Sequence, residues 1–143
     1  MLINIMNDKH TDEVIEMMRD FYSSSAVLTN GSEKIFRSDV ENCINDNPYL
    51  EGYVFTENDI VTGYAMVAKS FSTEFGKPCI WIEDIYFKPE HCGKGGGSQF
   101  LAFIGQKYPN TILRLEVEEE NERAVKLYRK AGFEVLPYME MKK

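Results

Sequence analysis

The sequence of 143 residues is poor in the side chains that build disulfide frameworks and metal sites. Its three cysteines, Cys43, Cys79 and Cys92, are odd in number and widely spaced, so they form neither a disulfide framework nor a CxxC metal clip. The two histidines, His10 and His91, are far apart and have no ligand-like spacing. We therefore expect no metal cofactor, and a reducing cytoplasm is the default location.

Long apolar runs and an excess of basic residues are also missing. No window approaches the roughly 18 apolar residues of a membrane span, and the N-terminal MLINIMNDKH does not resemble a signal peptide. Asp and Glu number 23 against 16 Lys and Arg, which gives a net charge of −7. Because nucleic acids and anionic membranes both favour clustered Lys and Arg, we expect neither as a partner. A cationic small molecule is compatible with this charge.

The remaining composition is that of an ordinary globular domain. Hydrophobic residues make up 43% of the chain and charged residues 27%. The length suits one domain with a substantial core. Since there is no internal repeat, low-complexity tract or linker-like run, we predict one domain over residues 1–143.

The pattern of apolar residues predicts strands and helices along the whole chain. Continuous or alternating apolar runs predict strands at residues 2–6, 52–56, 60–71, 80–87, 112–117 and 134–141. Helical spacing predicts helices at residues 11–22, from 38 to the Asn47-Pro48 pair, 100–108 and 124–131. This order predicts an α/β (α+β) fold in which a mixed sheet carries helices on both faces.

Capping signals predict the ends of several helices. Thr11 is expected to be an N-cap, because acidic residues follow it in the first turn. Ser38 and Glu41 have capping-box spacing, which would start the second helix. Gly132 would close the last helix as its C′ residue.

Two adjacent carboxylates interrupt the apolar stretch IWIEDIYF at residues 80–87. Neighbouring strand residues face opposite sides of a sheet, so a covered sheet cannot send both Glu83 and Asp84 to water. A buried carboxylate needs a partner or a proton. We expect Asp84 to be held by backbone N–H groups or by a cation.

A glycine-rich segment, PEHCGKGGGSQF, follows that strand at residues 89–100. Glycines 93, 95, 96 and 97 suit either a flexible turn or a backbone cradle that binds an anion at a helix N-terminus. The P-loop pattern is absent, and Ser98 and Phe100 stand where a dinucleotide fingerprint requires glycine. A nucleotide-binding regulatory domain is therefore disfavoured, and any diphosphate cradle is of another kind.

The segment PEHCGKGGGS resembles the pyrophosphate loop of the GNAT superfamily of acetyl-CoA-dependent N-acetyltransferases. A typical loop of that family reads P-E-Y-R-G-K-G-I-G-S, from which this chain departs at His91, Cys92 and Gly96. Downstream, NERAVKLYRKAGF matches the family pattern Asn-x-x-Ala-x-x-Leu-Tyr-x-Lys-x-Gly-Phe. Upstream, IEDIYF is most similar to diamine and polyamine acetyltransferases.

This resemblance implies a single-domain GNAT fold with a mixed, mostly antiparallel sheet, and acetyl-CoA as co-substrate without a metal. In the family, the strand before the loop pairs with the pantetheine arm and the loop amides hold the pyrophosphate. The residues expected to bind the cofactor are Ile85, Tyr86, Phe87, Cys92, Gly93, Lys94, Gly95, Gly96, Gly97, Ser98, Asn121 and Lys130. For Asn121 the alternative role is the N-cap of the last helix.

The resemblance also assigns an acid and a base. Glu83 would take a proton from the acceptor amine through water, and Tyr128 would donate one to the leaving thiolate. The alternatives are an ion-pair or strand-end role for Glu83 and a plain core role for Tyr128. The next candidate base lies in the cluster of Glu116, Glu118, Glu119 and Glu120. Cys92 is expected to be non-catalytic, because the loop lies away from the thioester.

We accordingly expect an enzyme, an N-acetyltransferase that moves an acetyl group directly to a primary amine of a small molecule such as a polyamine or an amino-sugar. The loop at residues 23–32 and the segment 72–78 would shape the acceptor groove. Alternatives are an acetyltransferase acting on proteins or peptides, and a non-catalytic sensor that binds acyl-CoA. An acid and a base would serve no purpose in a sensor. A homodimer is implied by resemblance alone.

Overall fold

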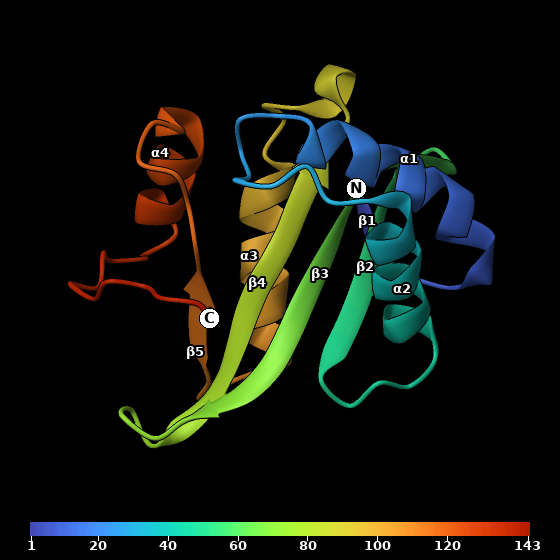
Figure 1. The fold of residues 1–143 in the computed structure, drawn as a ribbon. Helices are drawn as coiled ribbons and strands as arrows, with labels where there is room; N and C mark the ends of the chain where they lie inside the picture. Colours follow the sequence, from blue (N-terminus) through green and yellow to red (C-terminus); the bar gives the residue numbers. More distant parts are fainter.

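Five strands form one sheet in the order β1-β2-β3-β4-β5 in the computed structural model, which describes residues 1–143 (Figure 1). Neighbouring strands are antiparallel except β4 and β5, which run parallel. The strands are β1 Leu2–Ile5, β2 Leu50–Glu57, β3 Ile60–Ser72, β4 Lys77–Phe87 and β5 Ile112–Leu115. The predicted mixed, mostly antiparallel sheet is confirmed.

Helices cover both faces of this sheet, as predicted. Helices α1 and α2 lie on one face, and α3 lies on the other with α4 beside β5 (Figure 1). The helices are α1 Thr11–Tyr22, α2 Glu33–Ile44, α3 Gly96–Lys107 and α4 Glu122–Lys130, with short 3-10 turns η1 Asp8–His10 and η2 Pro89–His91. None of the helices is long and apolar enough to cross a membrane.

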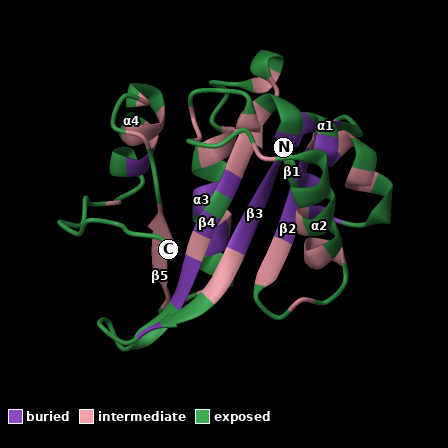
Figure 2. Ribbon diagram, viewed as in Figure 1, coloured by how far each residue is buried: buried purple, intermediate pink, exposed green.

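Alternation along the central strands divides the core into two layers. Val54 packs towards α1 and α2, whereas its neighbours Tyr53 and Phe55 pack towards α3. In β3, Tyr64 likewise packs in the layer of α1 and α2, and its neighbour Ala65 packs in the layer of α3. Figure 2 shows the resulting buried stretches in β2, β3 and β4 at the centre of the molecule. Because both faces are covered, these strands are almost continuously apolar.

Three predicted helix starts are wrong. Helix α3 begins at Gly96 rather than at Phe100, so two glycines of the loop lie in its first turn. Helix α2 begins at Glu33 rather than near Ser38, because the Ser32 side chain caps it by accepting the Ile35 N–H at 3.2 Å. Phe36 then anchors the first turn in the core. Thr11 is the first residue of α1 rather than its N-cap, since the preceding turn η1 already leads the chain into the helix.

The C-terminal segment also departs from the prediction. Residues 134–141 form no strand, although their apolar content suggested one. Pro137 lacks the N–H that a strand needs, and the side chains of Val135 and Tyr138 are exposed. The predicted end of α4 is confirmed, since Gly132 follows the C-cap with φ of +94°.

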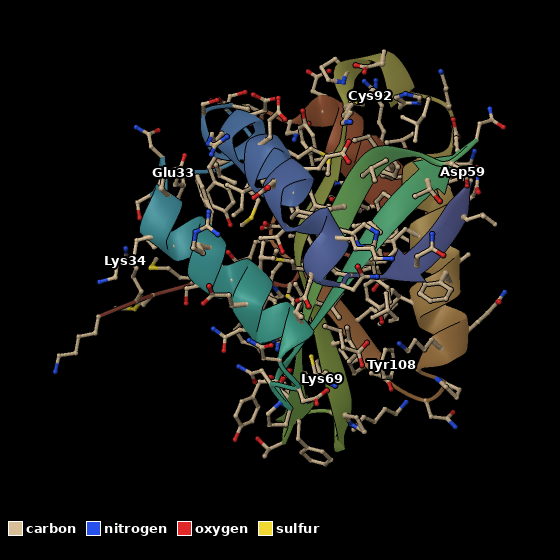
Figure 3. The ribbon with its side chains drawn as sticks, turned by 90° about the vertical axis from the view of Figure 1, so that its right-hand side faces the viewer. Glu33, Lys34, Asp59, Lys69, Cys92 and Tyr108 are labelled. Carbon is tan, nitrogen blue, oxygen red and sulfur yellow. The ribbon has the colours of Figure 1, made fainter.

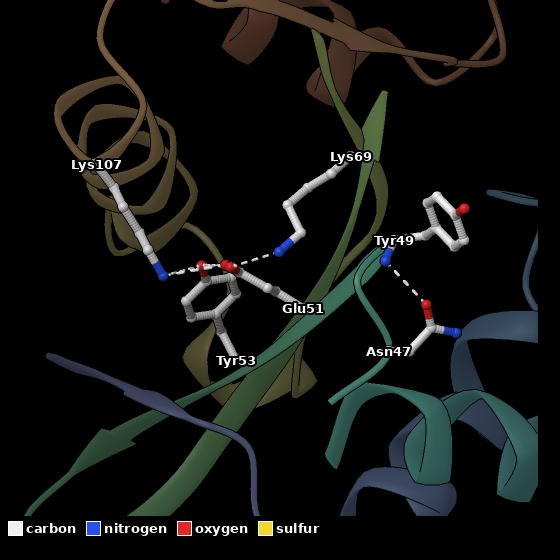
Figure 4. Close-up of polar contacts among 6 residues, drawn as sticks. All are labelled: Asn47, Tyr49, Glu51, Tyr53, Lys69 and Lys107. Atoms are coloured by element: carbon white, nitrogen blue, oxygen red, sulfur yellow. Dashed lines mark hydrogen bonds and ion pairs between the residues drawn. The ribbon is translucent and has the colours of Figure 1, made fainter. Parts of the chain in front are cut away.

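A polar network fixes one end of α3 to the sheet (Figure 4). The Glu51 carboxylate accepts from Lys69 at 3.1 Å, from Lys107 at 3.0 Å and from the Tyr53 hydroxyl. Burial alone would raise the pKa of Glu51, but hydrogen bonds from Tyr108, Tyr53, Lys107 and Lys69 lower it to about 2.

Replacing Glu51 by Gln is therefore expected to lower the free energy of unfolding by about 1–3 kcal/mol at neutral pH. Because the folded-state pKa is depressed, this contribution is present above the unfolded pKa of roughly 4.3 and is lost as the pH falls towards 2. Urea unfolding at a series of pH values measures it, with the exposed Glu41→Gln as control. A variant as stable as the parent at neutral pH would contradict the network's role.

Candidate active site

A β-bulge in β4 places its two adjacent carboxylates in different environments. The register between β3 and β4 pairs Met66 with Asp84 and Val67 with Ile82, so Glu83 has no partner of its own. The extra residue reverses the alternation of the strand. Ile82 and Ile85 consequently pack on the same side, towards α3 and α4. The bulge leaves Glu83 exposed while Asp84 is buried.

Asp84 is held by two tyrosines rather than by backbone N–H groups or a cation, which corrects the prediction. Its oxygens accept the hydroxyls of Tyr22 at 3.0 Å and Tyr64 at 2.9 Å. Burial raises the pKa of Asp84 to about 6, although these two hydrogen bonds act in the opposite direction. Since Tyr22 is the last residue of α1, this contact fixes the end of α1, where the loop at residues 23–32 begins, against β4.

A cleft opens where β5 ends before β4 does. The parallel pairing runs only from Cys79 with Ile112 to Ile82 with Leu115, so residues 83–87 have no neighbouring strand on that side. β5 is therefore shorter than the predicted strand at 112–117. The cleft has a volume of about 760 Å³ and extends from the loop at residues 23–32 to the glycine loop.

The free edge of β4 presents backbone groups to this cleft. The Lys88 N–H donates to the Thr62 carbonyl at 2.9 Å, and hydrogen-bonding direction alternates along an antiparallel strand. Tyr86 therefore pairs with β3, whereas Ile85 and Phe87 direct their backbone groups to the opposite side. The Tyr86 side chain packs near Phe21 on the α1 face, so it contributes only to the wall of the cleft.

Two glycines of the loop adopt a left-handed backbone. Gly93 and Gly95 have φ of +77° and +84°, which other residues adopt only with strain. Gly95 is the N-cap of α3, and the first helical hydrogen bond runs from the Gln99 N–H to the Gly95 carbonyl. The N–H groups of residues 96–98 thus have no helical partner, and these residues line the cleft. They form a cradle that suits an anion.

The other two glycines allow close packing. A Cβ atom at Gly96 would lie 2.5 Å from the Phe87 ring, and one at Gly97 would lie 2.7 Å from the Leu127 side chain. Because neither residue has a Cβ atom, α3 can approach β4 and α4 closely. The four glycines therefore have two structural roles, of which the sequence suggested only the backbone cradle.

Tyr128 lies on α4, where it belongs to the core and also lines the cleft. The residue is 9% exposed, and its ring packs edge-on against Phe133 at 5.9 Å between centroids. The hydroxyl has no hydrogen bond within the protein. It is not fully buried, so water can reach it. Burial raises the pKa of Tyr128, which keeps the hydroxyl protonated at neutral pH.

Asn121 occupies the N-cap of α4. Its Oδ1 accepts the Ala124 N–H at 3.3 Å, which confirms the alternative role proposed from the sequence. The amide NH₂ group makes no hydrogen bond within the protein, and Asn121 lines the cleft. Capping by the oxygen therefore leaves two donors for a ligand.

Four glutamates from three segments line the cleft beside the buried Asp84. Glu83 comes from β4, Glu116 and Glu118 follow β5, and Glu140 comes from the C-terminal segment. Although Glu83 is open to solvent, partial desolvation by the cleft wall raises its pKa, and the charges of Glu140 and Asp39 raise it further. The pKa of Glu116 is raised to about 7, mainly by a hydrogen bond with Glu140 and next by partial desolvation. Sequence reasoning missed Glu140, because its position depends on an irregular segment.

The cleft brings together most of the residues expected from the sequence. Lys94 and Lys130 are exceptions, since both are exposed and outside the cleft lining. Arg123, which the sequence interpretation overlooked, does line it. The expected residues that line it are Glu83, Ile85, Tyr86, Phe87, Cys92, Gly93, Gly95, Gly96, Gly97, Ser98, Asn121 and Tyr128. Of the alternative bases, Glu116 and Glu118 line it, whereas Glu119 and Glu120 do not.

Comparison with known proteins gives matches over most of the chain. A model of the acetyltransferase (GNAT) family matches residues 12–133. The thialysine N-epsilon-acetyltransferase of Bos taurus is 39% identical over 75 residues, which cover 50% of this chain and 44% of that protein. The Sus scrofa protein of the same name is 26% identical over 144 residues, covering 92% of this chain and 82% of that one.

Solved structures share the fold at lower identity. A possible acetyltransferase from Clostridium difficile 630 has a TM-score of 0.84 and 19% identity, covering 99% of this chain and 95% of that chain. An aminoglycoside N-acetyltransferase in complex with CoA has a TM-score of 0.77 and 16% identity, covering 99% and 93%. These identities establish similarity of fold alone.

Proposed function

The chain belongs to the acetyltransferase (GNAT) family, and from this premise we propose that it transfers the acetyl group of acetyl-CoA to a primary amine of a cationic small molecule. The observation that carries the proposal is one cleft in which an anion cradle, a free strand edge, a carboxylate and a protonated hydroxyl meet. The carboxylate is Glu83 and the hydroxyl is Tyr128. A binding module would need only the cradle and the edge.

The cradle and the strand edge suit the two ends of coenzyme A. The unpaired N–H groups of residues 96–98 would hold its diphosphate at the N-terminus of α3. Backbone groups of Ile85 and Phe87 would pair with the amides of its extended arm, as an added strand would. The amide of Asn121 would hold the same arm. Acetyl-CoA, whose thioester is an activated acyl group, supplies the group to be transferred.

Glu83 would act as the general base. An amine with a pKa of about 10 is almost wholly protonated at neutral pH and must lose a proton before it attacks. Partial desolvation in the cleft raises the pKa of Glu83 towards the working pH, which suits proton abstraction, directly or through one water. The amine nitrogen then forms the new bond to the acetyl carbon.

Tyr128 would act as the general acid. As the carbon–sulfur bond breaks, its hydroxyl donates a proton to the departing sulfur. Its pKa is raised above the ordinary value of about 10, so the proton is present at neutral pH. Solvent in the cleft restores both groups for the next turnover.

The acceptor half of the cleft favours a cation. The cleft is lined by Glu83, Glu116, Glu118 and Glu140, and the only Lys or Arg that lines it is Arg123, on α4 beside the glycine loop. The names of the Bos taurus relative and of the CoA complex refer to thialysine and to aminoglycosides, both amine-bearing small molecules. We therefore favour a polyamine or amino-sugar over a protein acceptor. Release of free thiol from acetyl-CoA with a panel of such amines and peptides tests the choice, and no release with any amine would favour a sensor.

Glu83→Gln is expected to lower kcat by about 100-fold, because the general base is removed. In the parent, kcat/KM should rise with pH as Glu83 loses its proton, and this acidic limb should disappear in the variant. The exposed Glu41→Gln on α2 serves as control. If Glu116→Gln removes the limb and Glu83→Gln does not, the base is Glu116.

A further inference from the structure

We infer that Arg123 supplies the cationic side chain that binds the diphosphate of coenzyme A, in place of the side chain missing from the glycine loop. This inference rests on the proposed function, since it concerns the same co-substrate. It assigns the charge to the first turn of α4 rather than to the loop or to either of the lysines expected from the sequence.

The loop itself brings no positive side chain to the cleft. Cys92 stands where related loops carry Arg or Gln, and its thiol donates to the Phe87 carbonyl at 3.4 Å. Lys94 is exposed outside the cleft lining. Figure 3 shows Cys92 at the end of the molecule opposite Lys69 and Tyr108, so the lysines of the Glu51 network cannot replace it.

Arg123 lies against this loop. Its Nη2 atom is 2.9 Å from the position that a Cβ atom would take on Gly93. The N-terminal turn of α4 therefore places a guanidinium over the left-handed part of the cradle. Among the 29 residues that line the cleft, Arg123 is the only Lys or Arg.

The guanidinium has no anionic partner within the protein. The cations that form ion pairs in the chain are Arg19, Lys69, Lys88 and Lys107. Arg123 also sits in the first turn of α4, where the helix dipole disfavours a positive charge. An anion between Arg123 and the N-terminus of α3 would satisfy both helix ends and the guanidinium.

The chemistry of arginine fits a diphosphate. A planar guanidinium donates two parallel hydrogen bonds to phosphate oxygens and keeps its charge at any working pH. The loop amides provide donors without a charge. Arg123 and the loop amides together would offer a positive charge and hydrogen-bond donors to the same anion.

Calorimetric titration of the parent, Arg123→Gln and the control Arg129→Gln with CoA and with 3′-dephospho-CoA tests the inference. Arg129 is an exposed residue of the same helix outside the cleft. Loss of a charged contact should weaken binding of both ligands at least about tenfold in Arg123→Gln, while the control changes less than about twofold. The kcat/KM for S-acetylpantetheine, which lacks the diphosphate, should stay the same.

A second variant addresses the missing loop side chain. Adding Cys92→Arg to Arg123→Gln should recover most of the lost affinity, because a guanidinium then reaches the diphosphate from the loop. Unchanged CoA affinity in Arg123→Gln would overturn the inference. If the variant loses affinity for CoA but not for 3′-dephospho-CoA, Arg123 binds the 3′-phosphate instead, which would also overturn it. If the parent binds no CoA at all, the proposed function itself fails.

Discussion

Tyr128→Phe is expected to lower kcat at least about tenfold while the affinity for CoA changes little. The substitution removes one oxygen and keeps the ring that packs against Phe133. Since the hydroxyl has no hydrogen bond within the protein, its loss leaves no buried partner unsatisfied. The expected deficit therefore comes from the unprotonated leaving thiolate rather than from a disturbed core.

Steady-state kinetics and calorimetric titration separate the two quantities. Tyr138→Phe is the control, because Tyr138 is exposed and its hydroxyl donates only to Glu74. The melting temperature of Tyr128→Phe should stay close to that of the parent. Turnover equal to the parent's would reject the acid role, and a matching loss of CoA affinity would make Tyr128 a binding residue.

The sheet and its layers were predictable because burial on both faces imposes a simple pattern. Strands covered on two sides are apolar throughout, as in β2 and β3, and apolar residues at helical spacing mark α1, α3 and α4. The start of α2 was missed because two serines, Ser32 and Ser38, offer similar caps. Only the burial of Phe36 in the folded protein favours the first.

The geometry of the candidate site was predictable where local sequence determines local structure. Left-handed glycines, an N-capping asparagine and a helix-borne tyrosine depend on a few neighbouring residues each. The bulge at Glu83 was not predictable, because it reflects the register between β3 and β4. Arg123 and Glu140 were missed for a related reason, since their neighbours in space lie far away in sequence.

Gly95→Val is expected to abolish CoA binding, with an affinity loss of at least about 100-fold, while the fold persists. A branched side chain at φ of +84° is strained by roughly 1–2 kcal/mol, so the loop shifts from the conformation that exposes its amides. Gly95 lines the cleft, and no atom beyond its two chain neighbours lies within 4 Å of the position that a Cβ atom would take there. The valine would therefore also occupy room that an approaching diphosphate needs.

Gly76→Val provides a matched control for strain. Gly76 lies in the turn between β3 and β4, has φ of +61°, and likewise has open space around it. Both variants should lose similar stability in urea unfolding, and only Gly95→Val should lose CoA binding. Normal binding by a folded Gly95→Val would exclude the cradle as the diphosphate site, whereas loss in both variants would attribute the effect to general destabilisation. Backbone amides at the start of α3 are thus tested separately from the charge of Arg123, although both are assigned to one anion.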